Sequence, residues 1–87
     1  MKFAKELKSR IHRKIMRFFA ENQGSIDTPR GVSTWIGEGI RPVRVALEDL
    51  VRTGFLKAHR TPSTIGYSCL LSKKELGALA SRLEDTD

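Results

Sequence analysis

Apolar residues near the N-terminus recur every three or four positions, which is the spacing of one face of an amphipathic helix. This pattern predicts a helix over residues 2–21. Asn22, Gln23 and Gly24 follow it, and such residues tolerate the left-handed backbone that often ends a helix. The stripe predicted to be buried consists of Ala4, Leu7, Ile11, Ile15 and Phe18.

A second helix is expected to begin at Thr28-Pro29. Threonine can cap the first free N–H groups of a helix, and proline suits the first helical position because its missing N–H costs nothing there. The helix should extend to about Ile36, with Val32, Trp35 and Ile36 on its apolar side.

A third helix is expected after the flexible turn at residues 37–39. It opens at Arg41-Pro42, again with proline near its start, and ends at Gly54. Its apolar side is formed by Val43, Leu47, Leu50 and Val51.

The helical period then gives way to two short strands, Phe55–Arg60 and Gly66–Leu71, with a turn of polar composition between them. Ser72 and Glu75 form a capping box, which predicts a last helix over residues 73–83. Residues 84–87 form an acidic tail that we expect to be frayed. The last helix carries Leu76, Leu79, Ala80 and Leu83 on one side.

The predicted order is helix, helix, helix, strand, strand, helix, in one domain over residues 1–87 with its core at about residues 11–72. The fold class is therefore mainly α with a small β-hairpin. Short helices are not stable alone, so they must bury their stripes against one another, and the hairpin must cover an open side of the bundle. Phe3, Leu7 and the leucines of the last helix exceed what one small core can absorb. We expect a homodimer through the first and last helices; alternatively, these residues close the domain's own open side.

Charge indicates the kind of partner. Sixteen basic residues against ten acidic ones give a net charge of +6, concentrated in residues 1–20 and 41–60. Two basic blocks on a small domain favour a polyanion: nucleic acid first and an anionic membrane surface second. The plainer alternative is a domain with basic solvent-facing sides. Membrane binding would remove Ile11, Ile15 and Phe18 from the core, so we disfavour it, and no apolar run reaches the length of a membrane span.

The cysteine content and the absence of catalytic motifs further limit the functions that the sequence allows. Cys69 is the only cysteine, which suits a reducing cytosol, so a cytoplasmic location is expected. His12 and His59 have no Cys or acidic neighbours at metal-ligand spacing, and both are expected to lie at the surface. We find no set of residues with the spacing of an enzyme active site, no cofactor-binding motif and no motif for a small-molecule ligand.

Several short patterns occur in a characteristic order: Ile11, Ile15 and Phe18; then Val32, Trp35 and Ile36; then Leu47, Leu50, Gly54 and Leu56 as Leu-x-x-Leu-x-x-x-Gly-x-Leu; then Tyr67 through Leu71-Ser72. In this order they resemble the small winged-helix transcriptional regulators of bacteria and archaea over about residues 11–72. The turn at residues 37–40 looks longer than the compact turn of that family. The resemblance implies a winged helix-turn-helix that binds double-stranded DNA and acts without catalysis.

By this resemblance, the third helix, about residues 42–53, would be the recognition helix in the major groove, and residues 57–66 would be the wing on the backbone or in the minor groove. Arginine can pair with guanine, and valine can contact a thymine methyl group. The candidate base contacts are Arg41, Arg44 and Val45, and the candidate phosphate contacts are Thr28, Arg30, Lys57, His59 and Arg60.

Four alternatives stay open at this point. Arg44, Glu48 and Arg52 lie four residues apart and could be a salt-bridged solvent face. Thr28 could serve only as a cap, and the hairpin could be an ordinary exposed one. The acids Glu48 and Asp49 also favour a different use of the fold, as a protein–protein interaction module within a larger assembly.

Overall fold

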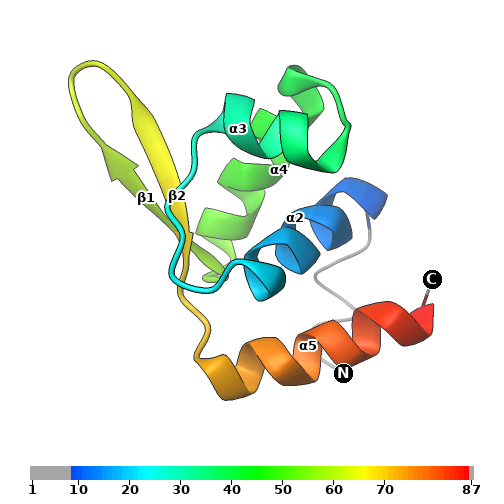
Figure 1. Cartoon of the computed structure of the whole chain (residues 1–87). Helices are drawn as coiled ribbons and strands as arrows, with labels where there is room; N and C mark the ends of the chain where they lie inside the picture. Colours follow the sequence, from blue (N-terminus) through cyan, green and yellow to red (C-terminus); the bar gives the residue numbers. More distant parts are fainter. Residues whose placement is uncertain (1–8, 87) are drawn as a thin grey trace.

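The computed structural model, which describes residues 9–86, consists of a group of helices with a short hairpin at one side (Figure 1). The elements are α2 (Arg10–Glu21), α3 (Pro29–Ile36), α4 (Ile40–Arg52), β1 (Leu56–Arg60), β2 (Ile65–Cys69) and α5 (Lys73–Thr86). This order confirms the predicted succession of helices and strands. Phe3, Ala4 and Leu7, and the side chains of Ala80 and Leu83, lie outside the part that the structure describes.

The second and third helices form a helix-turn-helix with a tight connection. Thr28 caps α3, its hydroxyl accepting a hydrogen bond of 3.1 Å from the N–H of Gly31. Gly37 ends the helix in the left-handed region, at φ 70°, which glycine adopts without a steric penalty. Because α4 already begins at Ile40, only residues 37–39 link the helices. The link is therefore shorter than the predicted turn of residues 37–40.

The two strands pair antiparallel from Leu56–Cys69 at the base to Arg60–Ile65 near the tip, which confirms the predicted hairpin. A further backbone contact was missed: Asp27 and Tyr67 form an isolated antiparallel bridge, with N···O distances of 3.0 and 2.7 Å. The link between α2 and α3 thus pairs with β2. Figure 1 shows the hairpin extending away from the helices, with this link running beside β2.

The core lies where α2, α3 and α4 meet. The prediction of Ile15, Phe18 and Val32 as core residues is confirmed, but α2 also buries Met16 and Phe19, so its apolar face is wider than the predicted stripe. Each such large side chain contributes about 1.5–3 kcal/mol on full burial. Trp35 is different: 74% of it is exposed, so its assignment to the core was wrong.

Helix α5 packs against α2 (Figure 1), and its capping box is present as predicted. The Ser72 hydroxyl accepts from the Glu75 N–H at 3.1 Å, and the Glu75 carboxylate accepts from the Ser72 N–H at 2.9 Å. Leu76 and Leu79 are buried within the single chain, so these two residues close the domain's own open side. The helix continues to Thr86, beyond the predicted end at residue 83. No helix within residues 9–86 is long and apolar enough to cross a bilayer.

Candidate nucleic-acid interface

One side of α4 is turned to solvent. Val43, Leu47 and Leu50 face the core with Ala46, so the 3.6-residue period places the intervening residues outward. Arg41 and Arg44 are exposed, and 64% of Val45 is exposed, which is high for an apolar residue. The outward side of the predicted recognition helix is therefore available over its first two turns.

The start of α3, the outward side of α4 and the tip of the hairpin converge on one groove of about 380 Å³. Arg30 and Arg44 supply positive charge from the two helices, and the first N–H groups of α3 add the positive end of its dipole. A groove with this electrostatic character suits an anion such as a backbone phosphate. Its lining residues are Thr28, Pro29, Arg30, Arg44, Ser63, Thr64 and Ile65.

This groove brings together three of the predicted site residues, Thr28, Arg30 and Arg44, from two helices. It also includes Ser63 and Thr64, which sequence reasoning did not single out. Their only sequence signal was the polar composition of the turn, and that signal does not reveal which helix the turn approaches.

Glu48 of α4 binds the hairpin, and not its neighbours on the same helix. Its carboxylate accepts hydrogen bonds from the Tyr67 hydroxyl and from the Arg60 guanidinium, the latter at 3.0 and 3.3 Å. The Tyr67 hydroxyl, followed by Arg60, holds the pKa of the Glu48 carboxyl below its usual value, although partial burial opposes this. Burial and the adjacent carboxylate raise the pKa of Tyr67 to about 12. The alternative of a ladder from Arg44 through Glu48 to Arg52 is therefore wrong.

Asp49 joins α4 to α2. Its carboxylate lies 2.5 Å from the Arg52 guanidinium and 3.3 Å from Nε2 of His12. The His12 side chain is only 18% exposed, so its predicted place at the surface was wrong. Both acids of α4 thus have partners inside the domain, and both join α4 to neighbouring elements.

The basic residues of the hairpin lie on two different faces. Side chains alternate along a strand, so Lys57 and His59 share one face and Arg60 lies on the other, toward α4. His59 is half-buried and its Nε2 lies 2.7 Å from the hydroxyl of Ser68. The structure therefore does not bring Lys57 and His59 together with Arg60 and Arg44.

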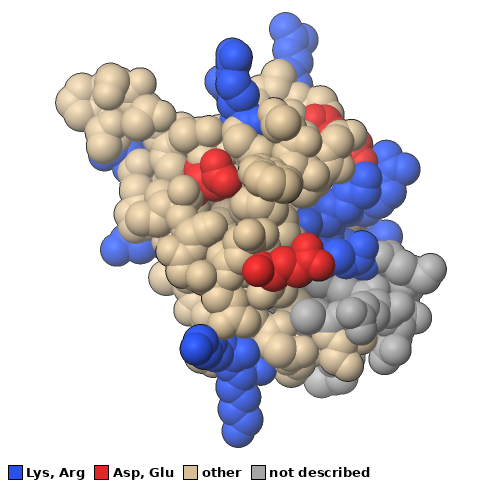
Figure 2. Space-filling view, in the orientation of Figure 1, with Lys and Arg blue, Asp and Glu red and all other residues tan. Residues whose placement is uncertain are grey.

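Basic side chains are unevenly distributed over the surface. Figure 2 shows them mainly at the margins of one face, along its upper and lower edges, on the hairpin side and in a group at the right, while the middle carries acidic and uncharged side chains. Within residues 9–86, no group of three or more His, Cys, Asp and Glu side chains could hold a metal ion. Burial raises the pKa of the Cys69 thiol, which disfavours the reactive thiolate.

The solved structures that this chain resembles include one described as a transcription regulator and one described as a possible one. The homodimeric winged helix-turn-helix DNA-binding domain of a possible ArsR-family regulator from Mycobacterium bovis matches with a TM-score of 0.68 and 16% identity, over 95% of this chain and 72% of that one. MepR, a transcription regulator of the Staphylococcus aureus multidrug efflux pump MepA, matches with a TM-score of 0.74 and 13% identity, over 98% of this chain and 64% of its own.

A Lactococcus lactis ZitR mutant in apo form matches with a TM-score of 0.66 and 22% identity, over 99% of this chain and 65% of its own. The chain thus spans less than two thirds of MepR and of this ZitR structure. The sequence matches no family model and no curated protein. The order of the elements, the register of the hairpin and the similarity to these solved structures all indicate the same fold. The chain has the winged helix-turn-helix fold.

Proposed function

We propose that this chain is a non-catalytic domain that binds double-stranded DNA and regulates transcription. The observation that carries the proposal is the groove in which the start of α3, Arg44 of α4 and the hairpin tip meet. Three separate elements present positive or hydrogen-bonding groups there, and the neighbouring side of α4 is exposed. The winged-helix regulators that share the fold support the same use.

In the proposed complex, residues 42–53 enter the major groove, whose width admits a helix. Arg41 and Arg44 lie at or just before the start of this segment, where recognition helices usually reach base edges. Each can bind guanine, and the exposed methyl groups of Val45 can contact thymine. Thr28 and Arg30 hold a phosphate in the groove at the start of α3, with Ser63 and Thr64 across from them.

The wing, residues 57–66, follows the backbone or enters the minor groove. Arg60 acts from its position beside Glu48, which orients the guanidinium and couples the wing to α4. Lys57 and His59, on the opposite face of the hairpin, contribute to the positive potential around the wing. Because Glu48 and Asp49 already have partners within the domain, they no longer favour the alternative of a protein-interaction module.

A homodimer would place two such surfaces on successive turns of the duplex, as two-fold symmetric regulators do. Residues 1–87 then act as one winged-helix domain per subunit, joined through the first and last helices. The Mycobacterium bovis domain, which has a similar fold, is homodimeric. No cofactor or small-molecule ligand is part of the proposal.

The test is fluorescence anisotropy of a labelled duplex at several salt concentrations. Neutralising about six phosphates should give a slope of about −5 in a plot of log K against log salt. Arg44→Ala should weaken binding about tenfold or more and make the slope shallower by about 1, because one cation leaves the interface. Arg52→Ala is the matched control, since Arg52 is an exposed arginine of the same helix that pairs with Asp49.

Binding that does not depend on salt, or the absence of binding at low salt, would refute DNA binding by this domain. Equal losses of DNA affinity in Arg44→Ala and Arg52→Ala would show that binding depends on the net charge alone. That result would refute the assigned site. If the unaltered chain does not bind DNA, and an Arg41→Ala, Arg44→Ala double variant still binds a partner protein, the domain is instead an interaction module.

A further inference from the structure

Glu38 lies in the turn between α3 and α4, and its carboxylate faces α2. It lies 2.7 Å from the Lys14 ammonium and 3.2 Å from the Arg10 guanidinium, and only 13% of the Glu38 side chain is exposed. The hydrogen bond from Lys14, followed by the charge of Arg10, holds the pKa of this carboxyl below its usual value, although burial opposes the shift. The turn is therefore joined to α2 through an acid that is largely shielded from water.

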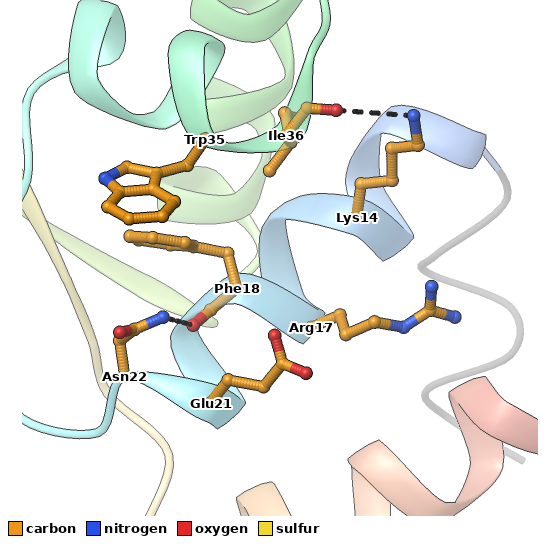
Figure 3. Close-up of a pocket in the computed structure, with 7 residues that line it drawn as sticks. All are labelled: Lys14, Arg17, Phe18, Glu21, Asn22, Trp35 and Ile36. Carbon is orange, nitrogen blue, oxygen red and sulfur yellow. Dashed lines mark hydrogen bonds between the residues drawn. The ribbon is translucent and has the colours of Figure 1, made fainter.

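The backbone of the turn is held on both sides of Gly37. Before it, the Lys14 ammonium donates to the backbone oxygen of Ile36 at 3.4 Å, as Figure 3 shows. After it, the Ser33 hydroxyl donates to the backbone oxygen of Glu38 at 2.5 Å, and the Glu38 N–H donates to the Ser33 backbone oxygen at 3.2 Å. Glu38 is thus held by its side chain, its N–H and its carbonyl group.

The start of α4, by contrast, has no side-chain cap. Its N-cap is Gly39, which has no side chain to accept a hydrogen bond from the first N–H groups of the helix. Residues 40–42 are exposed, and Val43 is the first residue of α4 that the core buries. Glu38, directly before the cap, is therefore the nearest preceding residue that several contacts hold in place.

The place of this helix start matters for the proposed function. Arg41 and Arg44, the candidate base contacts, follow Glu38 by three and six residues. An arginine that pairs with guanine makes two hydrogen bonds of about 2.9 Å each, and a displaced helix start would lose them. The charge of Glu38 by itself acts against DNA binding, because a carboxylate repels phosphates. Its charge and its position therefore have opposite effects on DNA affinity.

We propose that Glu38 is a positioning residue for DNA binding: its contact with α2 fixes the start of α4, and with it the place from which Arg41 reaches the base edges. Helix α2 is a firm support for this contact, because Ile15, Met16 and Phe19 are fully buried in the core. The inference rests on the proposed function and deepens it, since it assigns an acidic residue to a role that supports DNA binding.

The alternative is an ordinary surface ion pair, which contributes little to stability and sets no geometry. The exposed Arg52 pairs with Asp49 in this way, within one turn of a single helix. The pair of Lys14 and Glu38 differs, because it joins two elements and spans 24 residues of sequence. Only a contact between elements can set the place of one of them relative to the other.

The two alternatives predict opposite signs for Glu38→Ala. If charge alone matters, removing a carboxylate and freeing Lys14 and Arg10 to bind phosphates should strengthen duplex binding. If Glu38 positions α4, Glu38→Ala should weaken duplex binding by at least about fivefold, because the helix start must then be ordered on binding. The measurement is fluorescence anisotropy of a labelled duplex at low salt, at a temperature where urea unfolding shows that both proteins are folded.

Glu21→Ala is the matched control. Glu21 is an exposed acid at the other end of α2, and its removal changes the net charge by the same amount. The affinity of Glu21→Ala for the duplex should be equal to that of the unaltered chain or slightly higher, because a distant acid contributes only its charge.

A double-mutant cycle with Arg41→Ala tests whether Glu38 acts through the start of α4. Arg41→Ala already lacks the contact that Glu38 is proposed to position. The loss caused by Glu38→Ala should therefore fall to less than about twofold in that background, since residues that act through one contact are not additive. A general weakening of the fold would give the same loss with and without Arg41.

Three results would overturn the proposal. Glu38→Ala could bind DNA as tightly as the unaltered chain or more tightly. Glu21→Ala could weaken binding as much as Glu38→Ala does. The loss caused by Glu38→Ala could be the same with and without Arg41. Each of these leaves DNA binding intact, whereas an unaltered chain that does not bind at low salt refutes the proposed function and this inference together.

A second variant covers the case in which Glu38→Ala does not fold. Glu38→Gln keeps the size of the side chain and removes only its charge. It should also weaken duplex binding if Glu38 positions α4, and strengthen it if charge alone matters.

Discussion

The hydrogen bond from the Tyr67 hydroxyl to Glu48 helps to join the hairpin to α4, and Tyr67→Phe removes it with little other change. Tyr67 is only 2% exposed, so the phenylalanine ring should occupy the same buried position. A hydrogen bond to a charged group contributes about 1.5–3 kcal/mol. The Glu48 side chain is 46% exposed, so water replaces part of the lost bond. We therefore expect the free energy of unfolding to fall by about 1 kcal/mol.

The loss should depend on pH, in a direction set by Glu48. In the folded chain the pKa of this carboxyl is lowered from 4.5, first by the Tyr67 hydroxyl and then by Arg60. A lowered pKa gives stability that is present above the unfolded value and is lost as the pH falls through the folded value. The difference between the original chain and Tyr67→Phe should therefore be largest near neutral pH and shrink below 4.5.

Tyr67 itself gives a second, alkaline signature. Its pKa is raised from 10.0 to about 12, mainly by burial and then by Glu48, so the neutral phenol is favoured in the folded state. That stability is present below pH 10.0 and is lost as the pH rises through about 12. Tyr67→Phe has no phenol, so its stability should not show this contribution.

The assay is urea unfolding followed by circular dichroism, for Tyr67→Phe, Glu48→Gln and the double variant. The double-mutant cycle should give a coupling energy of about 0.5–1 kcal/mol at about pH 7, and less at about pH 3.5. Ser68→Ala is the matched control, because the Ser68 hydroxyl contacts His59 on the other face of the hairpin. Additive losses from Tyr67→Phe and Glu48→Gln at every pH would show that the two side chains do not interact as described.

Three further predictions concern stability, and each is measured by the same unfolding assay. Gly37→Ala should destabilise the fold by about 1 kcal/mol or more, because Gly37 has φ 70°. Gly77→Ala inside α5 should stabilise it by up to about 1 kcal/mol, because a Cβ there meets open space. A change of the same sign in both variants would contradict this. Thr28→Ala should cost about 1 kcal/mol by removing the cap of α3, and an unchanged free energy of unfolding would mean that the N–H of Gly31 finds another acceptor. Phe19→Ala should lower the free energy of unfolding by about 3–5 kcal/mol, because Phe19 is fully buried. Trp35→Ala should lower it far less, because Trp35 is exposed. Similar losses in the two variants would contradict the burial of the first ring and the exposure of the second.

Local patterns predicted the elements well because their causes lie within a few residues of each other. The cap at Thr28, the proline after it and the glycine at 37 act on their own turn of chain, and α3 begins and ends where they indicate. The capping box of Ser72 and Glu75 is equally local. The alternation of the two strands likewise predicted their antiparallel pairing, with ends displaced by one or two residues.

Sequence reasoning was weaker on the site. Of the residues it proposed, Thr28, Arg30 and Arg44 line one groove. It grouped Lys57 and His59 with Arg60, but strand alternation places Arg60 on the opposite face. It missed Ser63 and Thr64, because nothing in a polar turn indicates which helix it will approach. It also paired Glu48 with its helix neighbours, because a sequence shows which residues lie one helical turn apart but not which strand packs against the helix.

By itself, the sequence determined the order of the elements, the caps of α3 and α5 and most of the face that each helix buries, since these follow from the periodicity and backbone preferences of adjacent residues. The tertiary structure alone decided which distant groups meet: Glu48 with Tyr67 and Arg60, Asp49 with His12, and Trp35 on the outside of Phe18. The physical reason is that a side chain's partner depends on how whole helices and strands pack. When a strand or helix packs against another element, residues that are far apart in the sequence come within a few ångströms of each other. No local sequence pattern encodes which residues these are.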